Sequence, residues 1–72
     1  MDYKSWDYGP TVDKEQKIGP GARVDGIDYD NHIIYELKPN NPRAIRLGLK
    51  QLERYLGYMD DSWAGILVLY DK

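Results

Sequence analysis

The stretch GARVDGIDYDNHIIYELKP, residues 21–39, has the pattern of two short β-strands joined by a tight turn. In the first strand, expected over residues 22–29, Asp25 and Ile27 share one face because side chains alternate along a strand. Asp30 and Asn31 tolerate positive φ and predict a two-residue hairpin turn. Residues 32–38 contain Ile and Tyr, which favour strands, and are expected to form the second strand.

The hairpin carries a group of charged side chains that could perform chemistry. Glu36 and Lys38 are two residues apart on one strand, so they point to the same side of the sheet, and Asp25 lies on the neighbouring strand. Two carboxylates suit Mg²⁺, which prefers oxygen ligands and uses one or two carboxylates together with substrate phosphate. The lysine would orient water or stabilise negative charge on the phosphate. An exposed hairpin with three unrelated charges is the alternative.

The segment after the hairpin has strong helix signals. Pro39 ends the second strand, Asn41 is a good N-cap, and Pro42 suits the first helical position. The helix is expected over residues 42–56, ending near Gly57. Gly48 borders the apolar stripe. Glycine weakens a helix by about 1 kcal/mol relative to alanine, so its presence here predicts a packing reason, namely a close approach of the helix to the sheet. The apolar stripe, expected to face the core, consists of Ile45, Leu49, Leu52 and Leu56.

The other faces of this helix carry polar residues. Gln51 and Tyr55 fall on one flank, between the apolar stripe and the opposite face. That opposite face is basic, and it is either a solvated helix surface or a surface that follows nucleic-acid phosphates. The basic residues are Arg43, Arg46, Lys50 and Arg54.

The remaining segments complete a single small domain. Residues 64–70, AGILVLY, are continuously apolar and predict a strand buried on both faces. A strand, a helix and a second buried strand form a crossover unit, so this strand should run parallel to residues 32–38. Residues 1–20 are expected to form an irregular arm or an edge strand, and residues 11–18 are the weak strand candidate within them. The fold class is therefore α/β (α+β), with a small mixed sheet and one main helix.

Composition excludes some classes of protein. The chain of 72 residues has no cysteine, so disulfides and thiolate zinc sites are excluded. No apolar run is long enough to span a bilayer, and no signal peptide is visible. A net charge of −2 is unusual for a nucleic-acid binder. However, eight of the acids lie in residues 1–38, around the proposed site, where a divalent cation would offset them.

The order of these features resembles the PD-(D/E)xK nuclease superfamily, which has a restriction-endonuclease-like fold. Asp25 stands on one strand, Glu36-Leu37-Lys38 on the next, and a helix follows. Gln51 and Tyr55 match the Gln-x-x-x-Tyr pattern of the exonuclease-like branch. The amino-acid sequence of residues 23–55 is also similar to sequences of the nuclease domains at the C-termini of bacterial polymorphic toxins, such as contact-dependent inhibition and Rhs proteins.

This resemblance implies a role for each matching residue. Asp25 and Glu36 would bind Mg²⁺ or Mn²⁺, with the Leu37 carbonyl as a third ligand, and Lys38 would be the catalytic lysine. Gln51 would position water or substrate, and Tyr55 would contact the nucleic-acid backbone. The expected substrate would be DNA, with RNA as the less favoured alternative.

The resemblance also implies a biological setting. A cognate immunity protein would neutralise the toxin, which would be secreted or delivered into the cytoplasm of a target cell as part of a larger protein. If the chain is not a toxin, a cytoplasmic location is expected. These nucleases usually begin with a helix, which residues 1–20 do not predict. The expected explanations are that the chain is a fragment, that another chain supplies the helix, or that the core is trimmed at its N-terminus. Two alternatives follow: an inactive nuclease-like binding module, and a fragment that self-associates by strand exchange.

Overall fold

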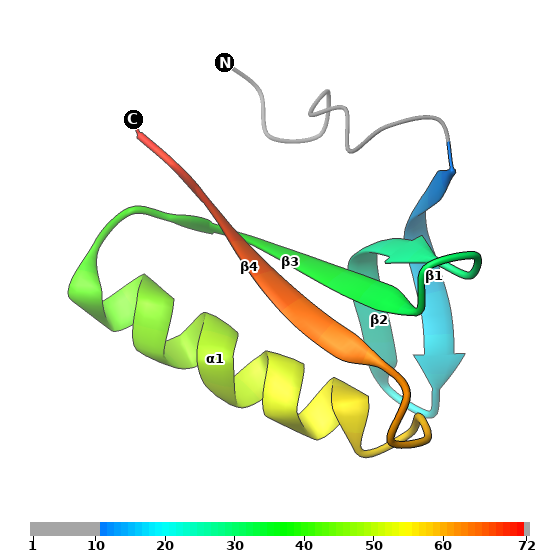
Figure 1. Ribbon diagram of the computed structural model, residues 1–72. Coiled ribbons are helices and arrows are strands. Elements are labelled where there is room, and N and C mark those ends of the chain that lie inside the picture. Colours follow the sequence, from blue (N-terminus) through cyan, green and yellow to red (C-terminus); the bar gives the residue numbers. More distant parts are fainter. Residues whose placement is uncertain (1–10, 72) are drawn as a thin grey trace.

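The computed structural model describes residues 11–71, in which one helix packs on a four-stranded sheet (Figure 1). The small mixed sheet with one main helix confirms the expected fold class. Residues 1–10 of the predicted arm lie outside the described residues, and the rest of that segment contains a strand, the alternative expected for it. The elements are β1 (Val12–Gly19), β2 (Ala22–Asp28), β3 (Ile33–Pro39), α1 (Pro42–Leu56) and β4 (Ala64–Tyr70).

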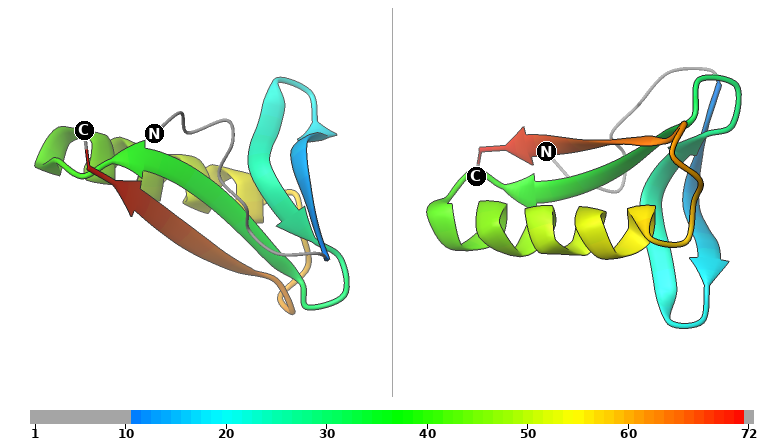
Figure 2. Two further views of the ribbon diagram at one scale, coloured as in Figure 1. Left: turned by 90° about the horizontal axis from the view of Figure 1, so that it is seen from above. Right: turned by 60° about the horizontal axis from the view of Figure 1, so that its bottom comes forward.

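The strands lie in the order β1-β2-β3-β4. The β1–β2 and β2–β3 pairs are antiparallel, whereas β3 and β4 are parallel, as the crossover argument predicts. Helix α1 connects the two parallel strands and lies along one face of them (Figure 2).

The β2–β3 ladder is short, and this shapes the whole molecule. It consists of Gly26 opposite Tyr35, Ile27 opposite Ile34, and the pair that adjoins the turn. Beyond these pairs the two strands diverge, so the β1–β2 hairpin stands steeply to the β3–β4 pair (Figure 2). The diverging halves of β2 and β3 carry Asp25 and the Glu36–Lys38 segment respectively.

The connection between β2 and β3 is longer than two residues, so the prediction of a two-residue turn was wrong. It spans residues 29–32, and positive φ falls on His32, at 55°. The cause is Asp28, which accepts hydrogen bonds from Thr11 Oγ1, the Asp30 amide, and the amide and side chain of Asn31 at 2.8–3.0 Å. The Asn31 side chain contributes most to holding the pKa of Asp28 below 3.8. Asp28 is therefore a buried acid whose hydrogen bonds hold the hairpin turn.

The start of α1 follows the sequence signals. Asn41 has an extended backbone, and its side chain accepts a hydrogen bond of 2.8 Å from the Ala44 amide, while Pro42 occupies the first turn. Such a cap stabilises a helix by about 1 kcal/mol. The predicted bounds of α1 are confirmed.

The buried face of α1 differs from the predicted apolar stripe. Leu49 was expected in the core but is 54% exposed, whereas Gly48 and Tyr55 are buried. The helix is turned because Gly48 allows the backbone to approach the sheet, and the Tyr55 ring then fills the space above β2 and β3. The central core consists of Ala22, Val24, Ile27, Ile34, Leu52 and Tyr55.

Strand β4 is less buried than predicted. Ile66 is 40% exposed and Leu69 is 38% exposed, so the prediction of a strand buried on both faces was wrong. The reason is position, because β4 is the outermost strand of the sheet formed by residues 11–71 and has a neighbour on one side only. Within the same residues, no helix has the length and apolarity needed to cross a membrane.

Candidate active site

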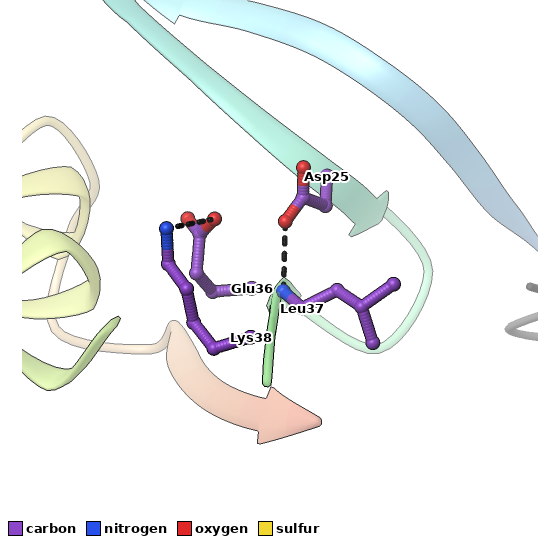
Figure 3. A network of polar contacts seen from close by, with 4 residues as sticks. All are labelled: Asp25, Glu36, Leu37 and Lys38. Atoms are coloured by element: carbon purple, nitrogen blue, oxygen red, sulfur yellow. Dashed lines mark hydrogen bonds and ion pairs between the residues drawn. The ribbon is translucent and has the colours of Figure 1, made fainter. Parts of the chain in front are cut away.

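The divergence of β2 and β3 leaves a cleft of about 260 Å³ at the carboxyl-terminal end of β3. The acidic and basic side chains predicted from the hairpin meet there, in the arrangement that Figure 3 shows. The residues that line the cleft are Asp25, Glu36, Leu37, Lys38, Pro39 and Tyr70.

Asp25 spans the gap between the diverging strands. Its Oδ2 atom accepts a hydrogen bond of 2.7 Å from the Leu37 amide (Figure 3). This bond lies beyond the last β2–β3 backbone pair, so a side chain replaces the ladder at this point. The carboxylate is therefore held against β3 at a point where the two backbones do not pair.

Glu36 is the most perturbed acid of the site. The residue is only 5% exposed, and its Oε2 atom is buried with no hydrogen-bond partner in residues 11–71. Burial, and secondarily the adjacent Asp25 carboxyl, raise the pKa of Glu36 from 4.5 to about 8, and the charge of Lys38 offsets only part of this rise. Glu36 thus faces the cleft as a buried carboxyl group whose ionisation is only partly compensated by the protein.

Lys38 extends in the same direction as Glu36 (Figure 3). Its Nζ atom is 3.9 Å from Glu36 Oε1, at the limit of an ion pair, and its side chain is 20% exposed. This contact is too long to satisfy Glu36, which agrees with the high pKa of that carboxyl. Lys38 therefore retains an ammonium group that can interact with another anion.

Helix α1 carries the two residues of the predicted Gln-x-x-x-Tyr pattern, and neither of them lines the cleft. Gln51 is half-buried, and its Oε1 atom is buried without a hydrogen-bond partner among the described residues. Tyr55 is 7% exposed, and its pKa is raised by burial and by the nearby charge of Glu36. Both residues thus face the sheet side of α1, more buried than the flank position expected from the sequence.

The donor set fits a hard divalent cation. Within residues 11–71 there is no group of three or more His, Cys, Asp or Glu side chains that could hold a metal. Two carboxylates are nevertheless sufficient for Mg²⁺, which completes its coordination with carbonyl oxygens, water and substrate. The unpartnered Glu36 Oε2 atom is the observation that favours a cation, because a bound cation would offset the cost of ionising this buried carboxyl group.

The basic residues of α1 lie apart from this cleft. Arg43, Arg46 and Lys50 are exposed and, with Leu47, line a separate hollow of about 330 Å³ that shares no residue with the cleft. Arg54 differs from them, because its Nη2 atom donates a 2.9 Å hydrogen bond to a carbonyl of the β1–β2 turn. The predicted stripe thus consists of four exposed cations, one of which tethers the helix to that turn.

Two cleft residues were missed by sequence reasoning. Pro39 and Tyr70 line the cleft, and they stand opposite each other in the parallel β3–β4 register. The parallel pairing predicted from the crossover could have brought them together, because the carboxyl ends of parallel strands meet at one edge of a sheet.

Comparison with known protein families indicates the family of this chain. Neither the curated proteins nor the solved structures include a match to this chain. A family described as restriction endonuclease fold toxin 9 matches residues 1–70, almost the whole chain. The four-stranded mixed sheet with one helix agrees with such a fold. The chain therefore belongs to the restriction endonuclease fold toxin 9 family.

Proposed function

We propose that this toxin domain is a nuclease that hydrolyses phosphodiester bonds with the help of Mg²⁺ or Mn²⁺. One observation carries the proposal: Asp25, Glu36 and Lys38 come from two strands and line one cleft, in which a buried Glu36 oxygen lacks a partner. Membership of a toxin family with a restriction endonuclease fold supports the same reaction class.

The metal would be held by oxygen atoms of the cleft. Its proposed ligands are the carboxylates of Asp25 and Glu36 and the backbone carbonyl of Leu37. A divalent cation supplies Lewis acidity, which polarises a phosphoryl oxygen and lowers the pKa of bound water.

The side chains of the chain itself would bind and orient the substrate. The Lys38 ammonium, with no close ion pair to Glu36, would stabilise negative charge that develops on the scissile phosphate. The Gln51 amide would orient the attacking water or the substrate through its unpartnered oxygen. The buried Tyr55 ring would offer only its hydroxyl to the nucleic-acid backbone.

The outer face of α1 would add affinity without chemistry. Arg43, Arg46 and Lys50 are exposed cations, and we propose that they bind phosphates away from the scissile bond. Arg54 would contribute less, because its guanidinium already binds the β1–β2 turn. We favour DNA over RNA as the substrate, following the resemblance to the superfamily.

The setting would be that of a delivered toxin. We propose that the domain acts in the cytoplasm of a target cell, as a part of a polymorphic toxin, and that a cognate immunity protein neutralises it in the producing cell. The toxin family supports this setting.

The test uses purified protein with supercoiled plasmid and, separately, total RNA, with Mg²⁺ or with EDTA. Cleavage of plasmid that requires the metal, and that Asp25→Ala, Glu36→Ala and Lys38→Ala each abolish in folded protein, would support the proposal. If the protein binds nucleic acid in a salt-dependent manner without cleaving it, and Lys38→Ala binds equally well, the domain is a binding module. Sedimentation at increasing concentration tests self-association by strand exchange in the same samples.

A further inference from the structure

Gly48 stands in the middle of α1, where glycine is unfavourable. A glycine inside a helix costs about 1 kcal/mol relative to alanine. The usual compensation, a left-handed backbone, does not apply, because Gly48 has ordinary helical geometry and, in residues 11–71, positive φ occurs only at Glu15, Gly21 and His32. The reason for glycine at this position must therefore be space.

The space beside Gly48 is occupied by two side chains from the sheet. A Cβ atom added at Gly48 would lie 2.6 Å from Leu67 Cδ1 and 2.9 Å from Lys38 Cγ. Both distances are shorter than real Cβ contacts, so one or both neighbours would have to move. The helix backbone is thus packed directly against the stem of the lysine that lines the cleft.

The two neighbours differ in how they can respond. Cδ1 is the terminal atom of Leu67, and a rotamer change can move it at small cost. Cγ is the second carbon of the Lys38 side chain, so its displacement carries the rest of the side chain and the Nζ atom with it. Filling the space at Gly48 would therefore move the ammonium away from its present place, 3.9 Å from Glu36 Oε1.

We propose that Gly48 is a positioning residue for Lys38: its missing side chain provides the slot in which the lysine stem lies. The expected effect on kcat rests on the proposed nuclease function. The position of Lys38 can be tested without any activity, through the rate at which its amine is acylated. Gly48 touches neither substrate nor metal in this scheme, and it acts only through the lysine.

The test is a set of four variants compared with the parent chain. Gly48→Ala fills the slot, Leu67→Val removes the Cδ1 atom, and the double variant removes the Leu67 clash while it keeps the Lys38 clash. Gly65→Ala is the matched control, because its added Cβ would crowd Leu52 and Leu56 on the same helix, at 3.1 and 3.4 Å, without meeting Lys38.

Two readouts separate positioning from packing. The kcat of Gly48→Ala should fall by about 100-fold, the effect expected for a misplacement of roughly 1 Å, with KM nearly unchanged. The double variant should recover thermal stability but not kcat, and Gly65→Ala should keep the parent kcat. In addition, Lys38 should react faster with a small amine-selective acylating reagent in Gly48→Ala, as measured by peptide mass spectrometry, because the displaced ammonium moves out of its partly covered place.

The inference is overturned if the double variant recovers kcat together with stability, since Gly48 would then serve packing against Leu67 alone. It is also overturned if Gly48→Ala has the parent kcat and the parent labelling rate at Lys38. Absence of cleavage by the parent chain would instead refute the proposed function, and the labelling rates would still decide the inference. If Gly48→Ala does not fold, kcat and the Lys38 labelling rate are compared between the double variant and Leu67→Val instead.

Discussion

Replacement of Glu36 by glutamine tests the electrostatics of the cleft through folding stability. Glutamine has nearly the same shape as glutamate but carries no titratable proton. The pKa of Glu36 is raised from 4.5 to about 8 in the folded chain, with burial as the main cause. Glu36→Gln removes this ionisation and leaves the packing of β3 nearly intact.

The sign of the pH dependence follows from proton binding. Below pH 4.5 the carboxyl is protonated in both the folded and the unfolded chain, so ionisation costs nothing. Between 4.5 and about 8 the unfolded chain has lost the proton that the folded chain retains, and stability falls as pH rises. Above about pH 8 both states are ionised, and the folded state bears the whole cost of a buried charge.

The magnitude is large for so small a domain. Each pH unit in this window costs about 1.4 kcal/mol of unfolding free energy, so the whole rise of the pKa corresponds to about 5 kcal/mol. The total stability of a chain of this length is about 4 to 11 kcal/mol. The metal-free protein should therefore be much less stable at pH 8 than at pH 5, whereas Glu36→Gln should lack this loss.

The assay is urea unfolding in EDTA, followed by tryptophan fluorescence from pH 5 to pH 8.5. Asp28 and Asp60 have pKa values held below 3.8 by their hydrogen bonds, to the Asn31 side chain and to Ser62 respectively, so their effects fall outside this range. The exposed Glu53→Gln is the control for loss of a carboxylate. If the stability difference between Glu36→Gln and the parent stays constant across this pH range, Glu36 is not a desolvated acid and the reasoning fails.

Three further outcomes are expected. Asp25→Asn should keep the fold, because an amide oxygen can still accept the Leu37 amide, but it should weaken Mn²⁺ binding measured by calorimetry; unchanged affinity would exclude Asp25 as a ligand. Asn41→Ala should lower the free energy of unfolding by about 1 kcal/mol in urea titrations, through loss of the helix cap; an unchanged midpoint would contradict the cap geometry. Arg43→Ala with Lys50→Ala should raise KM for nucleic acid and reduce its salt dependence without changing kcat, and a fall in kcat with unchanged KM would show that these cations act at the scissile bond.

Much of the architecture could be read from local patterns. The bounds of α1 and β4 follow from the Asn41–Pro42 start signal and from the apolar run of residues 64–70. The parallel pairing of β3 and β4 follows from the crossover rule. These features depend on residues close in sequence or on chain connectivity, which is why a single sequence predicts them.

Other features depend on contacts between distant segments and were predicted incorrectly. The turn after β2 is longer than expected because Asp28 binds Thr11 as well as the turn itself. Leu49 is exposed because the approach of Gly48 to the sheet decides which face of α1 is buried. Hydrophobic periodicity indicates which side of a helix is apolar, but it does not predict the shape of the surface on which the helix packs.

The candidate site also combines features that the local sequence predicts with features that depend on contacts between distant segments. The sequence alone determined the identity of the acids and the lysine, and the spacing that points Glu36 and Lys38 to one side, because alternation along a strand is a local property. Only the tertiary structure decided that Asp25 reaches the Leu37 amide across diverging strands and that Glu36 is buried with an unpartnered oxygen. It also placed Gly48 against the lysine stem. Distance and desolvation arise from the packing of α1 and β2 around β3, and no local pattern in β3 encodes them.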